Sequence, residues 1–258
     1  MVLEVVVGLA AGMVIALLTT PVGVSGAVFL LPVQLSVLAV PNPAVTPTNL
    51  LFNVVSGPGA LLRYGRRGAL AGPLTRIMLW GTLPGVVVGA LIRVYAVPGP
   101  RAFRLIVAAF LFPLGIWLWV RTFRTGAAAR TAPGPRAITL LSLAVGVVGG
   151  IYGIGGGSIL GPILVGRGMP VAVVGPAALA STFVTSIVGA GTYALLALTT
   201  EGAVAPHWLI GLSCGAGGLI GGYLGARLQP RLPEKGLRLL LGALATAVGV
   251  LYLAQSLA

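Results

Sequence analysis

Residues 149–162 read Gly-Gly-Ile-Tyr-Gly-Ile-Gly-Gly-Gly-Ser-Ile-Leu-Gly-Pro, inside an uncharged run that extends from Ala137 to Gly166. Glycine fills four of the five positions from Gly153 to Gly157. Four glycines would cost a helix roughly 3–4 kcal/mol relative to alanine. The stretch therefore predicts an unwound segment that leads into a short helix, within an apolar part of the chain.

The composition of the rest of the chain places this break in a membrane. Hydrophobic residues make up 57% of the 258 residues and the mean hydropathy is +1.07, whereas charged residues make up only 7%. A soluble domain carries about 25% charged residues, and a helix needs about 20 apolar residues to cross a bilayer. The chain is therefore predicted to be an all-α polytopic integral membrane protein. The expected helices cover residues 2–20, 25–39, 44–62, 70–92, 103–121, 137–152, 158–166, 171–197, 204–227 and 236–256.

The net charge of +13 does not indicate a nucleic-acid partner, because the basic residues lie in short gaps between apolar runs. The functional groups of enzymes are also scarce. The sequence has one cysteine (Cys214), one histidine (His207), no aspartate and three glutamates near the ends of predicted helices. We expect no enzyme, no metal site and no cofactor, and no buried carboxylate relay for protons.

The glycine-rich break has a counterpart in the first half of the chain. Residues 21–26 read Pro-Val-Gly-Val-Ser-Gly, and Pro32 follows Gly26 at the same spacing as Pro162 follows Gly156. We predict two membrane repeats, at 1–124 and 137–258, joined by a basic, Pro- and Gly-containing linker at 125–136. Each repeat would contain a broken or re-entrant first helix pair and three further transmembrane helices.

Loop charges favour inverted repeats. If each broken segment were one simple crossing, eight basic residues would lie on each side of the membrane. If each were a hairpin, thirteen would share one side, in residues 63–76, 121–136, 167 and 227–238, and Arg93, Arg101 and Arg104 would share the other. The uneven split is what the positive-inside rule expects. It places both termini outside and gives each repeat an odd number of passes.

The two breaks are the predicted anion site. A helix that starts at membrane depth directs unpaired N–H groups and the positive end of its dipole into a cavity. The alternative is that the glycines only allow close helix packing. The candidate residues at the breaks are Gly23, Ser25, Gly26, Gly155, Gly156, Gly157 and Ser158.

Hydroxyl and amide groups on the following helices form a second set of candidates. Thr48, Asn49 and Asn53 lie on one side of the helix predicted over 44–62, and Ser181 and Thr182 lie on its counterpart. These groups can donate hydrogen bonds to an anion, or can instead bond backbone carbonyls within their own helices.

The combination of these motifs resembles the sulfite exporter TauE/SafE family of membrane permeases. The similar motifs are Gly149-Gly150 with residues 153–158 and Pro162, Thr48-Asn49 with Ser56-Gly57, residues 62–68, Gly189-Ala190 with Tyr193, and residues 221–227. The first break is less glycine-rich than the family's usual run, and Ala177-Ala178 stands where the family often has a Thr-Ser pair. The resemblance implies a secondary permease for sulfite, organosulfonates or related sulfur-containing organic anions.

We therefore expect a multi-pass protein of the cell (inner) membrane that binds a small anion between two half-helix N-termini. Its expected partners are the anion and membrane lipid, with a homo-oligomer left open. A passive anion channel and a non-transporting membrane subunit are the alternatives to a carrier.

Overall fold

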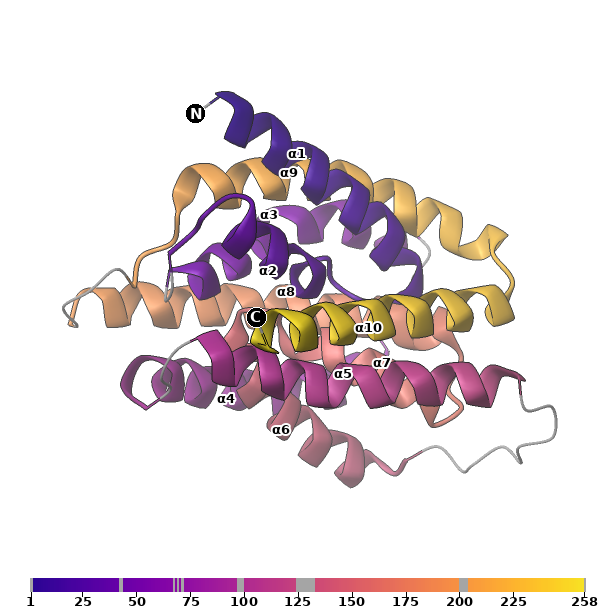
Figure 1. Ribbon diagram of the computed structural model, residues 1–258. Coiled ribbons are helices and arrows are strands. Elements are labelled where there is room, and N and C mark those ends of the chain that lie inside the picture. The colour runs from indigo at the N-terminus through magenta and orange to yellow at the C-terminus, as the bar shows by residue number, and fades with distance from the viewer. Residues whose placement is uncertain are drawn as a thin grey trace.

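The computed structural model describes residues 2–41, 44–66, 68, 70, 72–96, 100–123, 133–199 and 204–257. Of these described residues, 86% are helical and none lies in a strand. The helices (Figure 1) are α1 (Val2–Thr19), η1 (Thr20–Val22), α2 (Ala27–Ser36), α3 (Val45–Gly65), α4 (Pro73–Tyr95), α5 (Pro100–Phe123), α6 (Pro135–Tyr152), α7 (Gly156–Gly166), α8 (Val171–Ala197), α9 (Trp208–Leu228), η2 (Gln229–Arg231) and α10 (Glu234–Leu257).

The helices confirm a polytopic membrane protein. Six stretches in the described part of the chain are long and apolar enough to cross a bilayer, namely α1 with η1, α4, α6, α8, α9 with η2, and α10. Helices α2 and α7 have only 10 and 11 residues, which span about 15 Å at 1.5 Å per residue. Each follows one of the two predicted breaks and is too short to cross about 30 Å of hydrocarbon.

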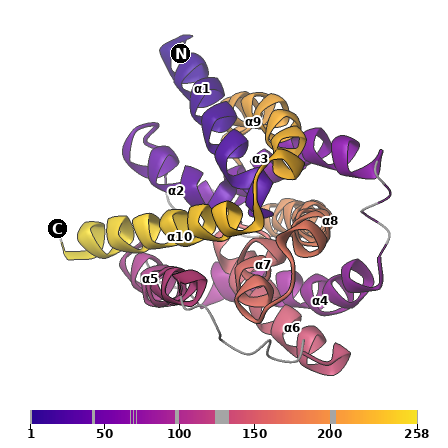
Figure 2. The same cartoon turned by 90° about the vertical axis from the view of Figure 1, so that its right-hand side faces the viewer.

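Glycine permits the closest helix contacts. Helix α4 packs on α6 and α1 packs on α9. A Cβ added to Gly89 would lie 2.1 Å from the carbonyl oxygen of Val147, and one added to Gly217 would lie 1.9 Å from that of Leu9. Each glycine therefore lets two backbones approach more closely than any side chain would allow. Figure 2 shows α8 near the middle of the bundle, and it packs against α3, α4 and α7.

The helix ends fall on two sides. In Figure 1 the end of α5, the start of α6, the end of α9 and the start of α10 lie on the right, which we call the basic end. The end of α4, the start of α5, the end of α8 and the start of α9 lie on the left. The hairpin alternative likewise puts residues 121–136 and 227–238 on one side and Arg93, Arg101 and Arg104 on the other. The orientation in the membrane and the inversion of the repeats stay predictions.

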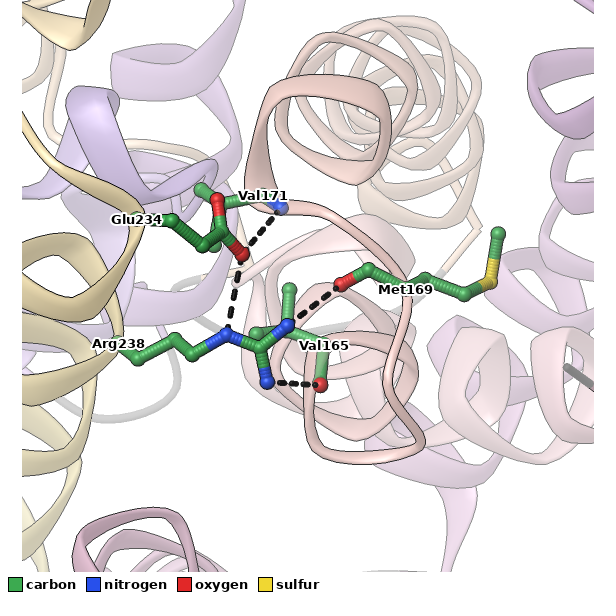
Figure 3. Close-up of polar contacts among 5 residues, drawn as sticks. All are labelled: Val165, Met169, Val171, Glu234 and Arg238. Carbon is green, nitrogen blue, oxygen red and sulfur yellow. Dashed lines mark hydrogen bonds and ion pairs between the residues drawn. The ribbon is translucent and has the colours of Figure 1, made fainter. Parts of the chain in front are cut away.

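Two charged side chains attach the connection between α7 and α8 to the start of α10 (Figure 3). The backbone N–H of Val171, the first residue of α8, donates to Oε1 of Glu234 at 3.1 Å. Arg238 donates from Nε to the same oxygen at 3.0 Å, and its terminal nitrogens donate to the carbonyl oxygens of Val165 (3.2 Å) and Met169 (3.4 Å). The carboxylate thus lies at a helix start and the guanidinium at a helix end, where the backbone dipoles favour each charge.

Candidate functional site

The first break separates α1 from α2. Gly23 caps the turn η1 and has a φ of +76°, a conformation that residues with a Cβ rarely adopt. A Cβ on Gly23 would also lie 2.2 Å from Cα of Gly175 on α8. The chain then reaches Ser25, whose hydroxyl accepts a hydrogen bond from the N–H of Ala27 at 3.2 Å. Glycine at position 23 is therefore required both by the turn and by contact with α8.

The second break separates α6 from α7. Gly153 and Gly155 have φ values of +69° and +71°. A Cβ on Gly153 would lie 2.2 Å from the carbonyl oxygen of Thr46 on α3. Helix α7 begins at Gly156, two residues before the predicted start at Ser158, because the positive φ values end at Gly155.

Asn53 on α3 connects the two breaks. Its side chain is 2% exposed. The Ser25 hydroxyl donates to Oδ1 of Asn53, and Nδ2 of Asn53 donates to the carbonyl oxygen of Gly153 at 3.5 Å. One turn earlier, Nδ2 of Asn49 donates to the carbonyl oxygen of Ala27, the first residue of α2, at 3.0 Å. Two segments that are far apart in the sequence therefore meet on one face of α3.

A small central cavity lies beside this junction. Its volume is about 20 Å³, by a measure in which one water molecule requires about 10–15 Å³. The lining has no charged side chain, and its polar groups are four hydroxyls and one amide. These belong to Thr20, Ser25, Asn53, Ser56 and Thr182. The cavity as it stands holds about one water molecule and is too small for an anion that has a sulfur and three oxygens.

Four of the predicted site residues line this cavity, namely Ser25, Gly26, Asn53 and Thr182. Thr48 lies at another point of α3, where its hydroxyl donates to the carbonyl oxygen of Ala44 at 2.7 Å and accepts from the N–H of His207 at 2.8 Å. Its hydrogen bonds thus attach the start of α3 to the residue that precedes α9.

The predicted residues of the second break pack against neighbouring helices. A Cβ on Gly156 would lie 2.6 Å from the Thr82 side chain, and one on Gly157 would lie 1.9 Å from the carbonyl oxygen of Ala178. Ser158 donates to the carbonyl oxygen of Ile154 at 2.8 Å. The Ser181 hydroxyl lies 3.0 Å from that of Thr82. None of these residues is in the lining of the central cavity.

Sequence reasoning missed Arg93, which it assigned to a loop as a topological charge. Arg93 lies in the last turn of α4 and is only 6% exposed. Its Nε donates to the Thr46 hydroxyl at 3.4 Å, and that hydroxyl donates to the carbonyl oxygen of Ile151 at 3.3 Å. A buried cation thus lies on the α4 side of the second break. The sequence placed it directly after the helix predicted over 70–92, and only the fold shows that this helix continues past it and that its side chain is buried.

Neither of the two glutamates that the structure describes lines the cavity. Glu4 is in the first turn of α1 and Glu234 in the first turn of α10, and Glu201 lies outside the described residues. Among the residues that the structure describes, no three His, Cys, Asp or Glu side chains come close enough together to hold a metal ion.

Comparison with known protein families gives one match over nearly the whole chain. The family model described as sulfite exporter TauE/SafE matches residues 8–252, nearly the whole chain. The family consists of membrane permeases for sulfur-containing anions and not of enzymes. No curated protein and no solved structure matches significantly.

Proposed function

This chain belongs to the sulfite exporter TauE/SafE family, and we propose that it is a secondary carrier that binds sulfite, an organosulfonate or a related anion at the junction of its two helix breaks. The observation that carries the proposal is the Asn53 side chain, which bonds Ser25 of one break and Gly153 of the other. Any change in the separation of the breaks alters this contact, so that binding and rearrangement would be coupled.

The chemistry of the cavity lining supports an anionic substrate. Hydroxyl and amide groups can each donate a hydrogen bond to an oxyanion. The lining contains no carboxylate that would repel the anion. The start of α2, whose preceding residue Gly26 lines the cavity, adds the positive end of a helix dipole. The anion would displace the internal bonds of these groups and would require the cavity to widen.

The packing pattern supports the proposed internal repeat. In the proposed repeat, α9 is the counterpart of α4, α1 that of α6 and α8 that of α3. Helix α4 packs on α6, and correspondingly α9 packs on α1. Helix α3 packs on α9 as α8 packs on α4. Exchanging the two halves leaves this set of contacts unchanged, as a pseudo-two-fold axis would require. The cavity and the two breaks lie between the halves, where transporters built from such repeats bind their substrates.

Counterflow in proteoliposomes tests the proposal. Vesicles that contain the wild-type protein are loaded with unlabelled sulfite, taurine or sulfoacetate, and a trace of the same anion in labelled form is added outside. These vesicles should transiently accumulate the label. A passive channel would equilibrate the label without accumulation, and a non-transporting subunit would give no uptake. The carrier would be refuted if, for all three anions, vesicles with the protein accumulated no more label than vesicles without protein.

A further inference from the structure

The central cavity has a much larger neighbour. A groove of about 550 Å³ lies beside the last turns of α3, against about 20 Å³ for the cavity by the same measure. It is lined mainly by apolar side chains such as Pro58 and Leu61, and Arg66 is its charged residue. Helix α3 runs parallel to α9, because Gly211 and Gly222 of α9 lie against Leu51 and Ala60 of α3. The last turns of α3, and the groove beside them, therefore lie toward the basic end, where α9 also ends.

The side chain of Phe183 on α8 is common to both linings. Its neighbour Thr182 belongs to the cavity alone. The Phe183 ring packs against α3 at Gly57, where an added Cβ would lie 2.5 Å from ring atom Cδ2. The ring thus occupies the space that a side chain at position 57 would otherwise fill, between α3 and α8.

Phe183 also has a distinctive place in the proposed repeat. The register that pairs Ser56 with Ser186 pairs Asn53 with Phe183. One half therefore supplies the amide that joins the two breaks, and the other supplies an apolar ring at the edge of the same cavity. An apolar constriction excludes ions because they must lose water to enter it.

We propose that the Phe183 ring is the gate between the central cavity and the basic-end groove, and that its displacement opens the anion's route to that side of the membrane. This inference rests on the proposed carrier function and assigns one specific barrier within it. Arg66 in the groove would attract an anion, and the ring would keep the cavity closed until α3 and α8 separate or the ring rotates.

Thiol accessibility tests the gate without any substrate. Ser56 lines the cavity and does not line the groove, so a Ser56→Cys variant in a Cys214→Ala background reports access to the cavity. A small methanethiosulfonate reagent is added to purified protein in lipid nanodiscs, and intact-mass spectrometry gives the labelling rate. Labelling should be slow while Phe183 is present. Phe183→Ala should accelerate labelling about tenfold or more, because it removes the packing that favours the closed state.

Leu61→Ala is the matched control, because Leu61 lines only the groove and its truncation should leave the labelling rate within about twofold of the parent. Phe183→Leu should give an intermediate rate, and it carries the test if the alanine variant does not fold. Unchanged labelling in both Phe183 variants would overturn the gate, and so would equal acceleration by Leu61→Ala. Faster labelling in a protein that shows no counterflow would leave the gate intact and refute the carrier.

Discussion

Gly157→Ala tests whether the second break depends on close packing. The added Cβ would lie 1.9 Å from the carbonyl oxygen of Ala178, 2.8 Å from its carbonyl carbon and 2.7 Å from the Thr182 hydroxyl. Two of these atoms are backbone, so that α7 must move away from α8. Overpacking of this kind typically lowers the free energy of unfolding by about 1–3 kcal/mol. For a chain of this size, each kcal/mol lost lowers the melting temperature by roughly 2–4 °C.

Gly191→Ala is the matched control, because Gly191 lies within α8 and a Cβ added to it would meet nothing within 4 Å. It should be neutral or should stabilise the protein by about 0.5–1 kcal/mol, because alanine favours helix more than glycine does. Thermal unfolding of both variants in detergent, without anion, measures the difference. If Gly157→Ala melts at the wild-type temperature, the glycines of this break are not needed for contact with α8, and the packing argument is wrong.

Three further predictions concern the ends of the helices. Arg238→Met should lower stability by about 1–3 kcal/mol, measured by thermal unfolding, because Val165 and Met169 lose charged donors. Glu234→Gln should leave counterflow intact, because the amide oxygen can still accept from α8; loss of counterflow with normal insertion would give the carboxylate a role in transport. In a Cys214→Ala background, an impermeant thiol reagent should label Ala205→Cys in intact cells and not Gly65→Cys, and the reverse result would invert the predicted topology.

Most helix positions follow from apolar run length and from proline and glycine. The predicted segments 171–197 and 137–152 correspond to α8 (Val171–Ala197) and α6 (Pro135–Tyr152). The start of α7 was predicted two residues late, at Ser158 instead of Gly156. Intrinsic propensity penalises every glycine alike, whereas of the four glycines at positions 153–157 only Gly153 and Gly155 adopt positive φ. Gly156 and Gly157 belong to helix α7 and pack against neighbouring helices.

The site was less predictable because it depends on which helices cross. Thr48 and Asn53 lie on the same helix and both have polar side chains. The Thr48 hydroxyl, however, accepts a hydrogen bond from the N–H of His207, whereas the Asn53 amide joins the two breaks. Helical spacing predicts a shared face and not which neighbour covers each turn. Phe183 carries no polar signal at all, and its position between a cavity and a groove appears only when α3 and α8 are packed together.

The most direct test of the central claim is the anion-dependent rise in melting temperature of purified wild-type protein and Asn53→Ala. The panel is sulfite, sulfate, taurine, sulfoacetate and carboxylates, and Thr192→Val serves as the control because the Thr192 hydroxyl bonds within its own helix, to the carbonyl oxygen of Val188. We predict that wild type and the control share a rise with at least one sulfur oxyanion, and that Asn53→Ala, folded and monodisperse, loses most of it. A full rise in Asn53→Ala would contradict binding at the junction of the breaks.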